Sequence, residues 1–279
     1  MSDLVALGNG ELGNAGAAIR RANDEGRAAL VGYLPAGYPT IDGGVDAIKA
    51  LVDGGADVLE IGLPYTDPVM DGVTIQRAAE IALAGGLRIR DVLATVEKLA
   101  AYSDVPVLVM TYWNPIERYG VDRFAVDFKA AGGAGLITPD LVPDEGAEWI
   151  AAADKNELDK VFLVSPSSTD KRIAMTTGNC RGFVYATAVM GVTGARDQTS
   201  DLAAPLVART KAATGLPVGV GLGVSNGDQA AAIAKYADAV IVGSAFVKAL
   251  DAGGAAGVRA LTEDLAEGVR REPRKPVDR

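Results

Sequence analysis

The sequence predicts a single (β/α)₈ TIM barrel, and three observations support this fold class. Eight short apolar runs, each four to seven residues long, alternate with segments of helical length along most of the chain. Runs that are apolar at nearly every position are typical of parallel strands covered on both faces. The length of 279 residues is close to the roughly 250 residues typical of such a barrel. We therefore expect one barrel domain at 17–270, between a flexible N-terminal segment (1–16) and a flexible basic tail (271–279).

The elements follow from the alternation of apolar runs with Gly- and Pro-rich loops. An extra N-terminal helix is expected at 17–26, with Gly26 as its stop signal. Strands are expected at 28–34, 56–61, 105–111, 135–138, 159–164, 182–187, 216–220 and 237–242. Helices are expected at 41–53, 74–83, 88–101, 121–131, 144–154, 170–177, 202–213, 227–235 and 254–270.

The segments after the strands have the composition of loops. They read PAGYPT, YWNPIERYG, PDLVPDE, SPSSTD, GLGVSNGD and, after the sixth strand, the long AVMGVTGARDQTSDL. After the eighth strand, GSAFVKAL opens a short helix. A doubly wound open sheet is the competing architecture, but the first strand is followed by PAGYP where that fold places G-x-G-x-x-G.

Composition excludes several classes of protein. A net charge of −9 argues against a nucleic-acid surface, although backbone N–H groups can still hold a small anion. The chain has no histidine, so Ser–His and Cys–His catalysis and His-based zinc sites are ruled out. Its one cysteine, Cys180, excludes an intrachain disulfide and fits a reducing compartment. With no secretory signal and no long apolar run, we expect a soluble, cytoplasmic protein without a metal site.

The segment 56–76, ADVLEIGLPYTDPVMDGVTIQ, contains the candidate catalytic acids. Alternation along the strand places Leu59 and Ile61 toward the helices and Glu60 toward the barrel interior, where desolvation raises the pKa of a carboxyl. Asp71 follows in a Gly-flanked loop. The alternatives are a buried Glu60 that is merely hydrogen-bonded, and an Asp71 that serves as turn residue or N-cap of the next helix. In the absence of histidine, we interpret Glu60 and Asp71 as an acid/base pair.

Three glycine-bearing loops predict a phosphate site. GVTG follows the sixth strand, GLGVS the seventh, and Gly243–Ser244 the eighth. Barrels often bind phosphate between the loops after strands 7 and 8, at the N-terminus of a short extra helix. Each loop alone is weak support, because glycine after a strand usually marks a turn.

Further side chains at the predicted strand ends could line an apolar pocket with polar edges. They are Tyr33, Tyr112, Asn114, Asp140, Tyr185, Leu222 and Ile241. For each of them alone, core packing or hydrogen-bond support is the alternative interpretation.

Six segments, in this order and spacing, carry a family resemblance. LEIGLPYTDPVMDGVTIQ, TYWNPIERYG, LITPDLVPDE, GVTGAR, GLGVS and VGSA resemble the tryptophan synthase alpha chain over about residues 17–270. The resemblance implies a (β/α)₈ barrel that cleaves indole-3-glycerol phosphate to indole and glyceraldehyde 3-phosphate. It also implies a beta-chain partner that takes up the indole and carries pyridoxal phosphate (PLP), an α₂β₂ assembly, and no cofactor on this chain.

The resemblance also implies site residues by motif. Glu60 matches the proton-transfer glutamate, Asp71 the aspartate that binds the indole N–H, and Tyr185 a tyrosine near the substrate. Thr193 matches a loop threonine that meets Asp71 on closure. The phosphate grip falls on Gly194, Gly223, Gly243 and Ser244.

The chain departs from the family pattern at two places, and two other functions are compatible with its sequence. Many family members have Ala-Asp-Gly-Pro where this chain has Met70-Asp71-Gly72-Val73, and some have arginine where it has Val189. Both departures bear on loop closure. The chain could alternatively be an allosteric phosphate-binding subunit with poor lyase activity, or a related barrel isomerase that releases no indole.

Overall fold

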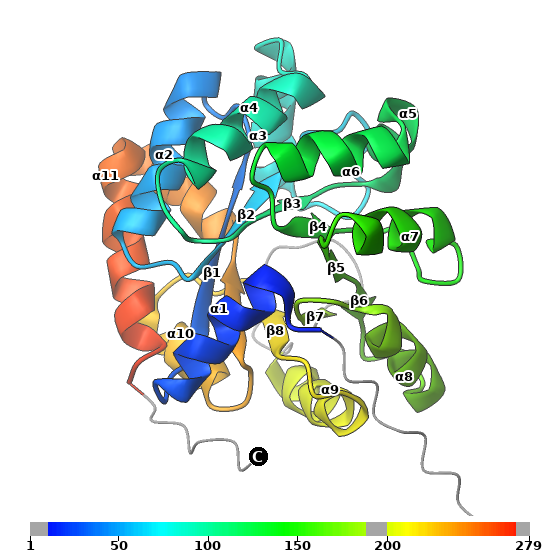
Figure 1. Cartoon of the computed structure of the whole chain (residues 1–279). Helices are drawn as coiled ribbons and strands as arrows, with labels where there is room; N and C mark the ends of the chain where they lie inside the picture. The colour runs from blue at the N-terminus through cyan, green and yellow to red at the C-terminus, as the bar shows by residue number, and fades with distance from the viewer. Residues whose placement is uncertain (1–10, 188–199, 272–279) are drawn as a thin grey trace, which may run out of the picture.

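The strands form one parallel sheet that curls into a barrel (Figure 1). The computed structural model describes residues 11–187 and 200–271. Its strands are β1 (Ala29–Pro35), β2 (Val58–Gly62), β3 (Val107–Met110), β4 (Gly135–Ile137), β5 (Asp159–Val161), β6 (Leu163–Val164), β7 (Val184–Thr187), β8 (Val218–Gly221) and β9 (Ala239–Val242). Their order is β5-β4-β3-β2-β1-β9-β8-β7-β6, so the two strands at its ends, β5 and β6, follow one another along the chain. This confirms the predicted barrel.

The predicted fifth strand, 159–164, is divided. Phe162 separates β5, which pairs with β4, from β6, which pairs with β7. The Phe162 side chain is buried in the core between sheet and helices. The division explains why nine strands occur where eight were predicted.

Helices surround the barrel (Figure 1). They are α1 (Gly13–Asp24), α2 (Ile41–Asp53), α3 (Val73–Ala84), α4 (Ile89–Ala100), α5 (Trp113–Tyr119), α6 (Val121–Ala130), α7 (Ala147–Lys155), α8 (Asp170–Asn179), α9 (Ser200–Ala213), α10 (Gly227–Ala234) and α11 (Ser244–Gly268). Inside α11, Gly254 has a non-helical backbone at φ 59°. The kink divides α11 into the expected short helix and the expected last helix.

Three helix predictions were wrong in detail. The segment YWNPIERYG was expected to be a loop but contains α5, in which Pro115 occupies the first turn, where a missing N–H costs little. Helix α1 begins at Gly13, four residues before its predicted start. Helix α7 begins at Ala147 rather than 144, after a turn in which Glu145 N–H donates to the Val142 carbonyl.

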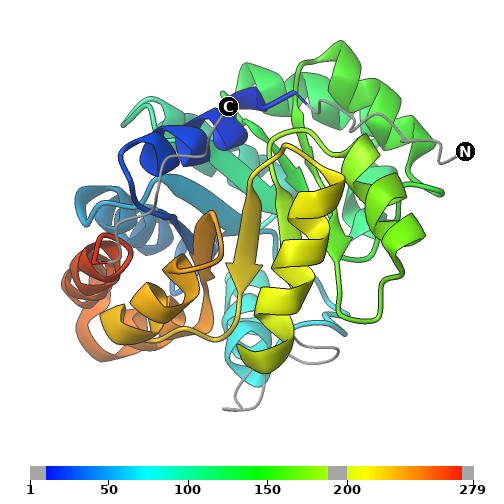
Figure 2. The same cartoon turned by 90° about the horizontal axis from the view of Figure 1, so that it is seen from below.

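Alternation along the strands separates two apolar cores, as expected for a barrel. Leu59 and Ile61 pack in the outer core between sheet and helices, whereas Val58 belongs to the inner core. Helix α1 contributes Ile19 and three alanines to that inner core. Seen from below, α1 lies across the end of the barrel where the strands begin (Figure 2). Helix α1 thus closes the interior at this end.

Candidate active site

Glu60 is a buried acid near the C-terminal end of β2. Its neighbours in register are Tyr33 on β1 and Leu108 on β3, and it is only 2% exposed. Within the described part of the chain, Oε2 of Glu60 has no hydrogen-bond partner. Burial, and secondarily the charge of Asp71, raises the pKa of Glu60 to about 8. Such a carboxyl holds a proton at neutral pH and can release it.

Asp71 lies in the loop between β2 and α3. The cap position of α3 is Gly72, so the interpretation of Asp71 as the N-cap is wrong. Its carboxylate hydrogen-bonds with Tyr112, and the Tyr112 hydroxyl also accepts from the Met70 N–H at 2.9 Å. Burial raises the pKa of Asp71 to about 6, and the hydrogen bond with Tyr112 works in the opposite direction. At neutral pH Asp71 is therefore ionised while Glu60 is protonated.

Tyr33 and Tyr185 are half-buried inside the barrel, above glycines on neighbouring strands. A Cβ atom at Gly62 would collide with the Tyr33 hydroxyl, and one at Gly221 would lie 2.5 Å from the Tyr185 hydroxyl. Burial raises the pKa of both tyrosines well above the ordinary value, and the charge of Glu60 adds to this effect in each. Both rings therefore share one compartment with Glu60.

The apolar residues proposed for the pocket differ in position. Ile241 is 4% exposed and belongs to the inner core, one residue before the end of β9. Leu222 directly follows β8 and packs, partly buried, against the outer core. Ile241 pairs with Gly221, the residue before Leu222, so both residues lie at the same end of the barrel.

The three phosphate candidates that the structure describes lie beyond β8 and β9. Gly223 is exposed, has a φ of 67° and leaves open space where a side chain would stand. Gly243 occupies the cap position of α11 and Ser244 its first turn, which has no acidic residue. None of the described side chains caps this helix end, so its first N–H groups can bind an anion. Thr193 and Gly194 lie outside the described residues.

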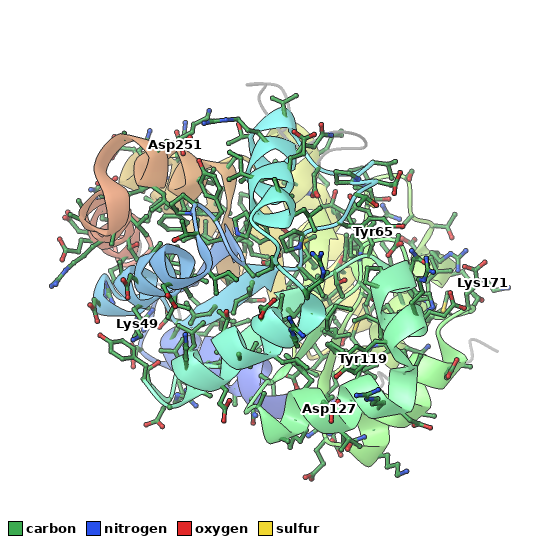
Figure 3. The ribbon with its side chains drawn as sticks, turned by 90° about the horizontal axis from the view of Figure 1, so that it is seen from above. Lys49, Tyr65, Tyr119, Asp127, Lys171 and Asp251 are labelled. Atoms are coloured by element: carbon green, nitrogen blue, oxygen red, sulfur yellow. The ribbon has the colours of Figure 1, made fainter. Side chains whose placement is uncertain are left out.

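Hydrogen bonds connect the loops around the site. Asn114 Nδ2 donates to the hydroxyl of Tyr65, labelled in Figure 3, at 2.9 Å. Asp140 accepts from the Trp113 N–H at 3.0 Å. Asn114 and Asp140 therefore serve as contacts between the loops after β2, β3 and β4.

Gln76 was not predicted from the sequence as a residue of the site. This residue of the first turn of α3 donates through Nε2 to the Asp71 carbonyl at 2.8 Å and the Pro68 carbonyl at 3.4 Å. A glutamine near the start of a helix matches no catalytic motif, so the sequence alone gives no reason to expect this contact. Over the same described ranges, no cluster of acids and cysteine could hold a metal ion, and no helix could span a membrane.

Comparison with known proteins gives consistent matches over nearly the whole chain. The family model described as tryptophan synthase alpha chain matches residues 19–272. The tryptophan synthase alpha chain of Acidothermus cellulolyticus is 59% identical over 92% of this chain and 97% of its own length. That of Mycobacterium avium is 57% identical over 91% and 94%.

Solved structures agree with these matches. A structure of Mycobacterium tuberculosis tryptophan synthase superposes with a TM-score of 0.88 at 55% identity, covering 93% of this chain and 99% of that one. An alpha-subunit structure from Pyrococcus furiosus superposes with a TM-score of 0.79 at 31% identity, covering 86% and 98%.

Proposed function

The chain belongs to the tryptophan synthase alpha chain family and is a lyase, and we propose that Glu60 and Asp71 perform its carbon–carbon bond cleavage. The proposed substrate is indole-3-glycerol phosphate, and the products are indole and glyceraldehyde 3-phosphate. The observation that carries this proposal is the pairing of the two acids: one mouth of the barrel holds a carboxyl with a pKa of about 8 and another with a pKa of about 6.

Glu60 is suited to move one proton twice. In its neutral form it protonates indole C3, which places a positive charge on the ring nitrogen. As a carboxylate it then removes the proton of the side-chain hydroxyl, the carbonyl forms, and the C3–carbon bond electrons return to the ring. The proton balance of Glu60 is zero, and a pKa near the working pH serves both steps.

Asp71 is suited to hold a charge in place. The positive ring nitrogen needs an anion beside its N–H, and a carboxylate fixed before the reaction supplies it without reorganisation. Tyr112 holds the Asp71 carboxylate by a hydrogen bond. Tyr185 and Tyr33 flank Glu60 and are proposed to enclose the reacting carbon atoms and the ring, with Ile241 and Leu222 at the apolar edge.

The phosphate is proposed to bind at the N-terminus of α11. Gly243 and Ser244 supply N–H groups there, Gly223 allows close approach of the β8 loop, and Gly194 is proposed to complete the grip from the loop after β7. Thr193 of the same loop is proposed to meet Asp71 when the site closes.

The family implies a beta-chain partner. We propose that the partner is the tryptophan synthase beta chain in an α₂β₂ assembly in the cytoplasm, and that PLP resides on the beta chain alone. The exposed apolar side chains of Val69 (75%) on the β2–α3 loop and of Val73 (78%) at the start of α3 support a docking face at this end of the barrel.

The test is to mix the purified chain with indole-3-glycerol phosphate and to measure indole, with and without the beta chain. We expect indole release in both cases. Glu60→Gln should abolish it, while binding of glyceraldehyde 3-phosphate survives because the phosphate contacts are unchanged. Full activity of Glu60→Gln would overturn the proposed role of Glu60, and wild-type protein that releases no indole would overturn the proposed reaction.

A further inference from the structure

We propose that Gln76 is a positioning residue that holds the Asp71 loop in its working conformation, an inference that rests on the proposed function. Two backbone carbonyls, those of Asp71 and Pro68, face the Gln76 amide. Carbonyl oxygens only accept hydrogen bonds, so the group opposite them must be the amide nitrogen. One side chain thus connects the start of α3 to both sides of the turn that presents Asp71.

The β2–α3 loop is packed at its start, where Leu63 is buried in the core and the Tyr65 ring lies 5.2 Å from that of Tyr112, but it contains little apolar packing around Asp71. Val69 is 75% exposed, Met70 is 39% exposed, and Val73, the first residue of α3, is 78% exposed. Side chains directed into solvent do not fix a loop. Val73 also leaves the backbone freer than a proline would, because proline fixes φ. Around Asp71, hydrogen bonds must therefore supply most of the order.

The hydrogen bonds of the loop have separate functions. Asp71 N–H donates to the Pro68 carbonyl at 3.1 Å, which closes the turn itself. Tyr112 accepts from the Met70 N–H at 2.9 Å and hydrogen-bonds the Asp71 carboxylate, which fixes the loop against β3. Gln76 fixes the same turn against α3, at 2.8 Å from the Asp71 carbonyl. Side chains in helices point back toward the N-terminus, so the first turn of α3 is the position from which this contact can be made.

The proposal predicts a specific kinetic effect. Asp71 meets a charge that is present only after C3 is protonated, so a displaced Asp71 loop lowers kcat more than ligand affinity. Displacement of a reacting group by about 1 Å can cost about a hundredfold in rate, and we expect roughly a tenfold loss of kcat here. The affinity for glyceraldehyde 3-phosphate, which lacks the indole ring, should not change.

The test compares Gln76→Met with Glu80→Met in the full-length chain. Methionine keeps the length of the glutamine side chain and removes the donor. Glu80 lies one turn further along α3, is exposed, and is the matched control. Only Gln76→Met should lose kcat and show faster amide hydrogen exchange over residues 67–73. Equal behaviour of the two variants would overturn the proposal.

A double-mutant cycle with Asp71→Asn tests whether Gln76 acts through Asp71. If it does, adding Gln76→Met to Asp71→Asn should lower kcat no further, because the placed charge is already gone. Independent, multiplying losses would contradict the proposal. If Asp71→Asn releases no measurable indole, the exchange comparison decides alone. Wild-type protein without indole release would instead refute the proposed function, and the exchange comparison would still test the hydrogen bonds of Gln76.

Discussion

Glu60 and Asp71 are both carboxyls that burial makes harder to ionise, yet to different extents. The pKa of Glu60 rises to about 8 because this residue is almost completely buried and lies near the charge of Asp71. The pKa of Asp71 rises only to about 6, because Asp71 is less buried and Tyr112 hydrogen-bonds its carboxylate. Between these values the pair holds one proton, and it resides on Glu60. Two acids whose environments separate their pKa values can take different roles in one reaction.

This separation predicts a bell-shaped pH dependence of indole release, with limbs near pH 6 and pH 8. Below about 6 Asp71 is protonated and cannot hold the ring N–H⁺, and above about 8 Glu60 has lost the proton that C3 must receive. Because the two acids interact, the limbs describe the pair. Steady-state rates from pH 5 to 9.5 check this, and a profile flat across that range would contradict the assigned roles.

Tyr112→Phe should shift the acidic limb to higher pH. The tyrosine hydroxyl lowers the pKa of Asp71, so its removal raises that pKa, and a several-fold loss of kcat at pH 7 should follow. The phosphate of the substrate also titrates near pH 6, but its pKa does not depend on Tyr112. Tyr119→Phe is the control, because Tyr119 donates to Asp127, its neighbour in Figure 3, at 2.7 Å outside the site. A limb that stays in place in Tyr112→Phe would refute the expected shift.

At the scale of elements, glycines in the strands make room for the tyrosines of the pocket. Gly221 ends β8 and faces the Tyr185 hydroxyl, while Gly62 ends β2 and faces the Tyr33 hydroxyl. In each case the glycine lies two residues beyond the register partner of the tyrosine, at the level that the hydroxyl end of the ring reaches. The compartment around Glu60 therefore depends on neighbouring strands in register as well as on its own residues.

Gly221→Ala should impair catalysis more than stability. Its new Cβ would lie 2.5 Å from the Tyr185 hydroxyl, so the ring must move out of its position. We expect a loss of kcat/KM of about tenfold. Gly215→Ala, at the turn before β8, meets open space and should leave activity near wild type. Indole release and thermal unfolding of both variants check this, and equal activity in the two would show that the Tyr185 position is unimportant.

The elements also show how far prediction from the sequence reached. Strand positions and the inward direction of Glu60 were predictable because alternation along a strand is a local property of the sequence. The break at Phe162 and the helix at Trp113–Tyr119 were not, because each depends on packing between segments far apart in the sequence. The same holds for Gln76, because its partner is a backbone carbonyl whose position depends on the conformation of the folded loop.

At the scale of the whole molecule, the fold places buried carboxyls at both ends of the barrel. Glu60 lies toward the mouth, and Asp159 begins β5 near the closed end. There Asp159 Oδ2 accepts from the Ala15 N–H at 2.8 Å and holds the start of α1. Burial raises the pKa of Asp159 to about 6. The site and the closure of the barrel thus share one property: each contains an acid that is harder to ionise in the folded chain than in the unfolded one.

This property predicts that stability decreases as pH rises from about 4.5 to 8. Below its unfolded pKa Glu60 is protonated in both states, and above about 8 it is ionised in both. Between these values only the folded state keeps the proton, so the unfolded state binds fewer protons and the free energy of unfolding falls with pH. Where such a group is protonated in the folded state and ionised in the unfolded state, the free energy of unfolding falls by about 1.4 kcal/mol per pH unit.

Thermal unfolding of wild type, Glu60→Gln and Glu80→Gln at pH 5.5, 7 and 8.5 measures the contribution of Glu60. We expect the Tm of wild type and of Glu80→Gln to fall with pH, and that of Glu60→Gln to fall less, because a neutral amide cannot ionise. The net charge of −9 also destabilises the folded chain at high pH through surface repulsion, but high salt screens that repulsion and leaves buried groups largely unaffected. If the difference between Glu60→Gln and wild type disappears in high salt, the buried acid is not its cause. If it persists, the acid that makes the site reactive also lowers the stability of the folded chain at alkaline pH.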